Sequence, residues 1–390
     1  MSAESWITEM LAVLEERGLR RQIRPLPSLG GRIEIDGRTV LNFSSNDYLN
    51  LSQTDELKQA AKEAIDRYGC GATASRLMAG TADLHDELER AVAEFRGCEA
   101  AVVFTSGYMA NVGAIGALVG RDDAVFCDRL NHASIIDGVS LSGAKLFRYQ
   151  HCDCEDLDSL LASETGFGRR LVITDTLFSM DGEIAPVADI AAICERRGAA
   201  LMVDEAHATG VFGATGAGVA EDADPEHKIM VHMGTLSKAL GGSGGFIAGS
   251  SALRDLMLNR ARAFIYTTGL PPASAASALA ALQLLTRKPD MGRQLLEKAA
   301  RFRARLAGLG LNMLGSGSQI IPILVGDNDK AVAWSRALLQ NDLLAVAVRP
   351  PTVPVGTARV RVSVTLAHDD ADLDRALDVL ASTAREAGVL

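Results

Sequence analysis

The stretch Ala200-Leu-Met-Val-Asp-Glu-Ala-His207 joins a short apolar run to two acidic residues and a histidine. A second stretch of the same kind, Ile229-Met-Val-His-Met-Gly-Thr-Leu-Ser-Lys238, ends in a lysine. Short apolar runs of this kind are typical of buried parallel strands. Ligands of open α/β sheets bind beyond the carboxyl ends of such strands, so we expect Asp204, His207 and Lys238 to meet in one crevice.

The side chains that follow these two strands suit an aldehyde cofactor with a pyridine ring. The amine of Lys238 can hold the aldehyde as a Schiff base. The carboxylate of Asp204 can keep the ring nitrogen protonated, which makes the ring an electron sink for a carbanion, and His207 can hydrogen-bond the phenolic oxygen. We therefore predict pyridoxal 5′-phosphate (PLP) as the cofactor. The alternatives are a solvated surface lysine, an aspartate that caps a helix or binds magnesium, and a structural histidine.

A phosphate site is expected where a predicted strand over residues 100–104 leads into a helix. The first turn of a helix offers free N–H groups and the positive end of the helix dipole, and Gly107 and Tyr108 lie there. Thr235 can add a hydroxyl donor to the same phosphate. Strand–glycine–helix turns also occur without a phosphate, so the turn needs the other site residues beside it.

Two more candidates follow predicted strands. His132 comes after a strand over residues 124–127 and opens a helix, so its ring can lie flat over the cofactor ring. Ser179 follows a strand over residues 171–175 in a comparable position. A plain N-terminal helix residue is the alternative for His132.

Arginines near the C-terminus are candidates for binding a carboxylate. The segment Arg349-Pro-Pro-Thr-Val-Pro354 precedes a predicted strand that contains Arg359-Val-Arg361. An Arg361 that points inward can clamp a substrate carboxylate with two hydrogen bonds. An exposed arginine is the alternative.

The sequence lacks the motifs that three other kinds of site require. The motif Asp204-Glu-Ala-His207 also occurs in helicases, which need a Gly-Lys-Ser/Thr phosphate loop, and this chain has no Gly-Lys dipeptide. A nicotinamide dehydrogenase needs Gly-x-Gly-x-x-Gly after its first strand, and none follows here. The segment His151-Cys-Asp-Cys154 has no second ligand cluster, which a structural zinc would need, so we expect no metal.

Strands and helices alternate between residues 46 and 285, which predicts an α/β fold with a mostly parallel sheet covered by helices on both faces. Before this region, a short amphipathic helix precedes a probable hairpin turned by Asp36-Gly37. After it, alternation resumes in a smaller α/β domain. We therefore divide the chain into an N-terminal segment (1–45), a large domain that binds the cofactor (46–285) and a small domain (286–390).

The composition limits which binding partners and which cellular location are expected. The chain has 390 residues, of which 48% are hydrophobic, and a net charge of −10, which argues against a nucleic acid or an anionic membrane as the main partner. No apolar run is long enough to span a membrane, and the N-terminus lacks a signal-peptide pattern. The six cysteines form no disulfide framework, so we expect reduced thiols and a cytoplasmic location.

Taken together, the motifs resemble the α-oxoamine synthases, a family of fold-type-I PLP enzymes. The resemblance covers residues 20–385 and rests on the segments Asn42-Phe-Ser-Ser-Asn-Asp-Tyr-Leu49, Ser106-Gly107, Asn131-His-Ala-Ser134, Phe178-Ser-Met-Asp-Gly182, Asp204-Glu-Ala-His207 and Thr235-x-x-Lys238. It implies a PLP-dependent acyltransferase that condenses an amino acid with an acyl-CoA and releases carbon dioxide. It also implies a homodimer whose active sites lie at the subunit interface.

The resemblance implies residue roles where the motifs match. Lys238 would be the base for proton transfer, and Asp204 and His207 would contact the cofactor ring as described above. The remaining residues expected around the cofactor are His132, which would stack on the ring, and Gly107, Tyr108, Ser179 and Thr235. The residues expected to meet the amino-acid carboxylate are Asn46 and Arg361. The residues expected to reach the phosphate of the partner subunit are Thr267 and Thr268.

Two further segments are similar to family members that join L-alanine to a pimeloyl thioester, either pimeloyl-CoA or pimeloyl carrier protein, in biotin biosynthesis. These are Leu19-Arg-Arg21 and Arg349-Pro-Pro-Thr-Val-Pro-Val-Gly-Thr-Ala-Arg359, and they imply that Arg20 and Thr352 contact the acyl substrate. Another segment, residues 128–138, looks like the glycine-using 2-amino-3-ketobutyrate ligases. A glycine C-acetyltransferase or another acyl-CoA-condensing relative is therefore an alternative, and so is a non-catalytic partner subunit of the same fold.

Overall fold

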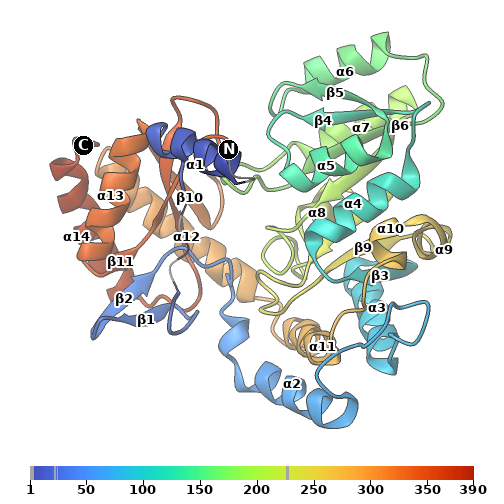
Figure 1. The fold of residues 1–390 in the computed structure, drawn as a ribbon, viewed down its shortest axis with the longest axis horizontal. Coiled ribbons are helices and arrows are strands. Elements are labelled where there is room, and N and C mark those ends of the chain that lie inside the picture. The colour runs from blue at the N-terminus through green and yellow to red at the C-terminus, as the bar shows by residue number, and fades with distance from the viewer. Residues whose placement is uncertain (1–3, 22, 24, 225–227) are drawn as a thin grey trace. The chain divides into compact units, whose positions relative to one another are not determined.

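The computed structural model describes residues 4–21, 23, 25–224 and 228–390. These residues form two compact units, whose elements are labelled in Figure 1. The terminal unit contains Met1–Ser45, Met180–Gly182 and Glu297–Leu390, and the large unit contains Asn46–Ser179 and Glu183–Leu296. The N-terminal segment and most of the small domain therefore belong to the same unit.

A seven-stranded sheet forms the centre of the large unit, in the order β3-β9-β8-β7-β6-β4-β5. The strands are β3 (Ala100–Phe104), β4 (Ala124–Asp128), β5 (Lys145–Tyr149), β6 (Arg170–Asp175), β7 (Ala200–Asp204), β8 (Val231–Thr235) and β9 (Gly245–Gly249). The neighbours from β8 to β5 pair in parallel, which confirms the mostly parallel sheet. Strand β9 runs antiparallel to both β3 and β8.

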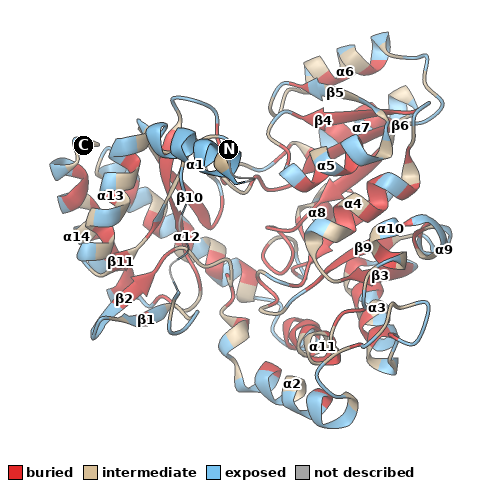
Figure 2. Cartoon of the chain, in the orientation of Figure 1, coloured by how far each residue is buried: buried red, intermediate tan, exposed pale blue. Residues whose placement is uncertain are grey.

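The sheet has a hydrophobic core on each face, because successive strand residues point to opposite sides. Val172 and Val203 belong to one core and Ile173 and Met202 to the other. The helices that contribute to the first core are α6 (Cys154–Ser163), α7 (Val187–Arg197) and α8 (Val219–Ala223). The helices that contribute to the second are α4 (Gly107–Leu118), α5 (Ala133–Ser142), α9 (Ser251–Arg260) and α10 (Arg262–Ile265). The buried strands are red in Figure 2, and burial on both faces explains why their sequences are continuous apolar runs.

Four more elements complete the large unit. They are η1 (Leu51–Gln53), α2 (Asp55–Tyr68), α3 (Asp83–Arg96) and α11 (Pro272–Arg287). Helix α11 packs against both α2 and α3. Helix α12 (Met291–Gly308) then carries the chain from the large unit into the terminal unit.

The terminal unit contains two small sheets, ordered β1-β2-β11 and β10-β13-β12. Its elements are α1 (Ser5–Glu16), β1 (Arg32–Ile35), β2 (Arg38–Asn42), β10 (Ile320–Gly326), α13 (Asn328–Gln340), β11 (Leu343–Leu344), β12 (Val346–Val348), β13 (Ala358–Ser363) and α14 (Asp370–Glu386). Ile35 pairs with Arg38, and Asp36 and Gly37 both have positive φ. The predicted hairpin with an Asp-Gly turn is thus confirmed.

Within the described residues, no helix combines the length and the apolar character that crossing a membrane would require.

Candidate active site

A cavity of about 240 Å³ lies in the large unit at the carboxyl ends of the parallel strands. Its lining includes seven residues selected from the sequence, namely Gly107, Tyr108, His132, Asp204, His207, Thr235 and Lys238. It also includes Ser106, Asn111, Ser134, Asp175 and Ser237. The residues that follow β7 and β8 meet in one crevice because these two strands are parallel neighbours.

Asp204 is the last residue of β7 and is only 3% exposed. Its Oδ1 accepts a hydrogen bond from the N–H of Ala206 (2.9 Å), and its Oδ2 accepts one from Nδ2 of Asn111 (2.7 Å). Each carboxylate oxygen has a second lone pair. The carboxylate is therefore held in one orientation and can still accept a hydrogen bond from a ring N–H.

Asn111 is a site residue that the sequence analysis missed. It lies on α4 four residues after Gly107, and residues at this spacing share one helix face. Its Nδ2 donates both to Asp204 and to the Oγ of Ser134 (2.8 Å). The spacing from Gly107 is a signal that could have identified Asn111, because it places the amide on the side of α4 where the phosphate is expected.

His132 is the N-cap of α5, and hydrogen bonds fix its position. Its N–H donates to Oδ2 of Asp175 (2.9 Å), and its Nδ1 lies 2.7 Å from the Oγ of Ser134. Because Asn111 also donates to Ser134, hydrogen bonds connect His132 to Asp204 through two side chains. The imidazole and the carboxylate are therefore positioned together.

Burial and neighbouring charges shift the pKa values of His132 and Asp175 in the cavity. Desolvation lowers the pKa of His132, and the charge of Lys238 lowers it further, while Asp204 acts in the opposite direction. Burial raises the pKa of Asp175 well above its usual range, and so does the negative charge of Asp204, its register partner on β7. At neutral pH the site therefore holds a neutral imidazole and a carboxyl group that resists ionisation beside Asp204.

His207 is buried, and its partner comes from a distant part of the sequence. The Oη of Tyr48 lies 2.6 Å from Nδ1 of His207 and 3.2 Å from Oδ1 of Asn46. Tyr48 thus connects Asn46, a predicted substrate contact, to an imidazole that lines the cavity. Tyr48 belongs to the family motif at residues 42–49, but its local sequence predicts no role for it.

The expected phosphate end of the cavity is formed by the first turn of α4 and by the end of β8. Ser106 caps α4 by accepting a hydrogen bond from the N–H of Met109 (3.2 Å). A Cβ at Gly245 would lie 2.6 Å from the Cα of Gly107, so two glycines allow the helix start to approach β9 closely. The hydroxyls of Thr235 and Ser237 lie 2.7 Å apart beside this turn.

The other predicted cofactor residues of the large unit have varied positions. Lys238 is half-buried, whereas Tyr108 is 48% exposed and donates a hydrogen bond to Asp137 (2.7 Å). Three predicted residues are absent from the described lining of the cavity, namely Ser179, Thr267 and Thr268. Thr268 instead forms an isolated β-bridge with Ser75.

The predicted substrate arginines and Thr352 belong to the terminal unit. Arg361 on β13 is 8% exposed and donates a hydrogen bond to Ser363 (2.8 Å), so it points inward. Arg20 forms an exposed ion pair with Glu15 (3.2 Å). Thr352 accepts a hydrogen bond from Nη2 of Arg21 (3.2 Å).

A small cavity of this unit includes Arg21 rather than Arg20. Its volume is about 190 Å³, and its described lining contains Leu19, Arg21, Met180, Val348, Arg349 and Thr352, among others. The double arginine of the sequence therefore presents its second member, not its first, to the cavity of Thr352. Adjacent positions in the sequence gave no signal to separate the two.

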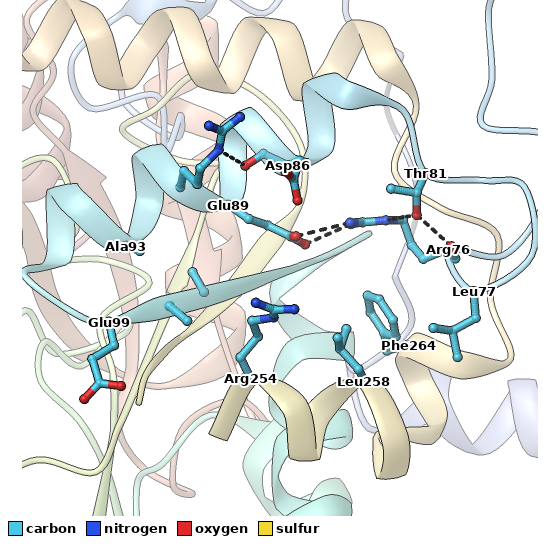
Figure 3. Close-up of a pocket in the computed structure, with 13 residues that line it drawn as sticks. Arg76, Leu77, Thr81, Asp86, Glu89, Ala93, Glu99, Arg254, Leu258 and Phe264 are labelled. Carbon is cyan, nitrogen blue, oxygen red and sulfur yellow. Dashed lines mark hydrogen bonds and ion pairs between the residues drawn. The ribbon is translucent and has the colours of Figure 1, made fainter. Parts of the chain in front are cut away.

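A cavity of about 260 Å³ elsewhere in the large unit is drawn in Figure 3. Nη1 of Arg76 donates to Oε1 of Glu89 (2.9 Å), and Glu89 also accepts the N–H of Val103 (2.9 Å). The hydrogen bond from Val103 joins β3 to Glu89 of α3, and the ion pair with Arg76 holds the same carboxylate in place. The described residues that line this cavity include no lysine, histidine or cysteine, so the chemistry favours the cavity around Lys238 as the active site.

The residues around Lys238 fit PLP. An amine, a buried carboxylate and two imidazoles suit its aldehyde and its ring. A helix N-terminus with two hydroxyls beside it suits its phosphate. The fit involves both ends of the cofactor, because Asp204 and the start of α4 line the same cavity.

Comparisons with known proteins give consistent matches along the whole chain. The family model for class I and II aminotransferases matches residues 38–380. The 8-amino-7-oxononanoate synthase of Geobacter sulfurreducens is 48% identical over 384 residues, which are 97% of this chain and 98% of that protein. The structure of serine palmitoyltransferase (SPT) with a PLP internal aldimine has a TM-score of 0.93 at 30% identity, covering 100% of this chain and 99% of that one. The crystal structure of 8-amino-7-oxononanoate synthase from Francisella tularensis has a TM-score of 0.76 at 30% identity, covering 89% of this chain and 98% of that one.

Proposed function

Because the chain belongs to the class I and II aminotransferase family, we propose that it condenses L-alanine with a pimeloyl thioester. The products are 8-amino-7-oxononanoate, carbon dioxide and the free thiol of CoA or of a carrier protein, and the reaction serves biotin synthesis. The fold-type-I architecture, the resemblance to α-oxoamine synthases and PLP as the cofactor are confirmed. The observation that carries the proposal is full-length similarity to 8-amino-7-oxononanoate synthases together with Lys238 and Asp204 in one cavity.

When bound, PLP withdraws electrons from the α-carbon of an amino acid through its protonated ring. Asp204 supplies the negative charge that keeps the ring nitrogen protonated, and Asn111 and Ala206 hold that carboxylate in place. His207 would offer its Nε2 to the phenolic oxygen, because its Nδ1 is engaged by Tyr48. The start of α4 would hold the phosphate, with the hydroxyls of Thr235 and Ser237 beside it. Because the Thr235 hydroxyl donates to the carbonyl oxygen of Gly244 (2.8 Å), it would have to turn to donate to the phosphate.

Lys238 would remove a proton from L-alanine, and His132 would lie against the cofactor ring. The Nζ of Lys238 would hold the cofactor, and its free amine would take the proton from the α-carbon. A neutral His132 can lie against the cofactor ring without adding a positive charge, which agrees with the lowered pKa of this residue. We assign the substrate carboxylate to Asn46 and Arg361.

We assign the far carboxylate of the pimeloyl chain to Arg21 and Thr352. Arg21 is a guanidinium that already donates to Thr352 and lines the same small cavity. A second arginine, Arg349, donates to the carbonyl oxygen of Gly18 and lines that cavity too. We therefore expect the far carboxylate of the acyl chain to bind beside the two positively charged guanidinium groups of this cavity in the terminal unit.

Alanine at position 21 is expected to raise the KM for the pimeloyl thioester roughly 10- to 100-fold, because a charge-assisted hydrogen bond is lost. The kcat is expected to change little. Arg20→Ala is the matched control, since Arg20 pairs with Glu15 at the surface, and its KM is expected to stay within about twofold of the wild-type value. Steady-state kinetics on both variants separate the two neighbours, and the opposite ranking would return the role to Arg20.

We also propose a homodimer in which Thr267 and Thr268 reach the phosphate of the partner subunit. Thr268 pairs with Ser75, and the segments on either side expose Met78 (82%) and Tyr266 (71%). Large exposed apolar side chains on neighbouring segments are typical of subunit interfaces.

A cytoplasmic location is supported by the six cysteines, all of which are free thiols. The net charge of −10 supports the absence of nucleic-acid and membrane partners.

The proposed reaction is tested by offering several substrates to the PLP-loaded enzyme. L-alanine, glycine and L-serine are each combined with pimeloyl-CoA, pimeloyl carrier protein and acetyl-CoA, while thiol release and carbon dioxide are measured. We expect the largest kcat/KM for L-alanine with one of the two pimeloyl thioesters. A preference for glycine with acetyl-CoA would identify a glycine C-acetyltransferase instead, and no turnover with any pair would favour a non-catalytic subunit.

A further inference from the structure

Three side chains of different chemistry meet beside the carboxyl end of β4, and none of them lines the cavity around Lys238. Asp128 is the last residue of β4, while His151 and Cys152 follow β5, which pairs with β4 in parallel. The ligand atoms of the three residues lie within 4.8 Å of one another. We propose that Asp128, His151 and Cys152 bind one zinc ion.

The distances between the ligand atoms suit a tetrahedral metal. Oδ1 of Asp128 lies 3.0 Å from Nδ1 of His151, which lies 3.8 Å from Sγ of Cys152. A tetrahedral zinc ion with bonds of about 2.0–2.3 Å separates its ligand atoms by roughly 3.3–3.6 Å. Sγ of Cys152 lies 3.9 Å from Nε2 of His151 as well, so the partly exposed side chain of Cys152 has to rotate toward Nδ1 to close the site. A water molecule can take the fourth position.

The surrounding structure holds the three ligands before any metal arrives. Asp128 is buried, and its two oxygens accept the N–H groups of Leu130 and of Cys152 (both 2.8 Å). These bonds fix the carboxylate against the backbone of another ligand. The anchored oxygen Oδ1 keeps its approach to Nδ1 of His151, which is the side where the metal would lie.

The outer nitrogen of His151 has the partner expected for a metal ligand. Its Nε2 lies 3.3 Å from Oε2 of Glu183, and its ring packs edge-on against Phe178 with centroids 4.3 Å apart. Phe178 and Glu183 belong to one turn, in which the N–H of Phe178 donates to the carbonyl oxygen of Glu183 (3.0 Å). Metal-bound histidines almost always donate the other ring N–H to such a carboxylate, which fixes the ring and raises its basicity.

The ligand set favours zinc over the common hard cations. A thiolate, an imidazole and a carboxylate match the ligands of zinc, whereas magnesium and calcium prefer oxygen alone. From the sequence alone no metal is expected, because His151-Cys-Asp-Cys154 lacks a second ligand cluster. The fold supplies the missing ligand from β4, at a position that spacing within the motif cannot reveal. The proposal does not depend on the reaction that the enzyme catalyses.

The test uses the chelator-treated holoenzyme, in which PLP covers the amine and the imidazoles of the active site. Cobalt(II) serves as a spectroscopic probe for zinc. We expect one cobalt per chain, with a thiolate-to-cobalt charge-transfer band and the visible absorption of a tetrahedral ion, and we expect zinc to displace it. Cys152→Ser should abolish the charge-transfer band, whereas Cys154→Ser, two residues further along and outside the cluster, should keep it.

A second variant tests the outer carboxylate without touching a ligand. Glu183→Gln is expected to weaken zinc binding roughly 10- to 100-fold while the cobalt spectrum keeps its shape. Asp128→Asn is less suitable, because this carboxylate also anchors two backbone N–H groups. Unchanged absorption of the bound PLP verifies that each variant is folded. Equal cobalt binding by wild type and Cys152→Ser, or no stoichiometric binding by wild type, overturns the proposal.

Discussion

Replacing Lys238 with alanine is expected to lower turnover by roughly 10³-fold or more, because the covalent anchor of the cofactor and the base for proton transfer are lost together. The variant should also lose the absorption of covalently held PLP. Borohydride should add the mass of reduced PLP to the wild-type chain and not to the variant. The backbone should be unaffected, because Lys238 is half-buried at the edge of a cavity rather than in a core.

Lys228→Ala is the matched control for this experiment. Lys228 lies near the start of β8, ten residues before Lys238 in the printed sequence, and forms a surface ion pair with Glu195 (2.7 Å). Such pairs contribute little to stability, so the control should keep its turnover and its mass gain. If the Lys238→Ala chain still gained the mass of PLP, another lysine would carry the cofactor and the assignment of the site would fail.

The sequence predicts the central strands of the large sheet well because β3, β4, β6, β7 and β8 are buried on both faces. The runs that end at Asp204 and Thr235 are apolar without alternation, and this pattern is typical of parallel strands between two helix layers. It does not give strand direction, which explains why a strand is expected near residues 246–248 but its antiparallel direction as β9 is not. The signal was nevertheless present, because only Leu236–Gly244 separate β8 from β9, and a parallel crossover needs about a dozen residues or more.

The predicted residues that line the cavity around Lys238 lie at or just after the end of a strand or open a helix, where position alone limits what a side chain can face. The residues that were missed contribute through contacts between distant segments. Tyr48 reaches His207 across 159 positions of sequence, and no local pattern indicates that pairing. Asp175 is distinguished by its burial and by Asp204 as its register partner, and neither can be read from the local sequence. Which of Arg20 and Arg21 binds the acyl substrate depends on which one lies beside Thr352. The local sequence cannot separate them, because they are adjacent.

Replacing Asp204 with asparagine is expected to leave PLP bound and to lower kcat by roughly 10³-fold, because the shape of the side chain is kept while its charge is lost. Without that charge the ring nitrogen is not held protonated and the ring withdraws electrons poorly. Asparagine also has one acceptor where aspartate has two, so it cannot accept from both Ala206 and Asn111. One of these donors loses its partner, which should cost about 1–3 kcal/mol of stability.

Asn111→Ala is the control that separates the effect of the charge of Asp204 from the effect of its orientation. It keeps the negative charge of Asp204 and removes only the hydrogen bond to Oδ2, so its kcat is expected to fall far less than that of Asp204→Asn. Stopped-flow absorption of bound PLP and steady-state kcat distinguish the two. An Asp204→Asn enzyme with the wild-type rate would show that the ring nitrogen does not depend on this carboxylate.

The pH dependence of kcat in the Asp204→Asn variant also tests the role of the neighbouring carboxyl group, Asp175. The charge of Asp204 is one of the causes that raise the pKa of Asp175, after burial. Removing that charge therefore lowers the pKa of Asp175 and favours its ionisation beside the same ring. If Asp175 then replaces part of the lost charge, kcat of Asp204→Asn should rise with pH, and the double variant with Asp175→Asn should lose both this rise and the residual activity. A residual rate that is independent of pH and unchanged in the double variant would limit Asp175 to holding the N–H of His132.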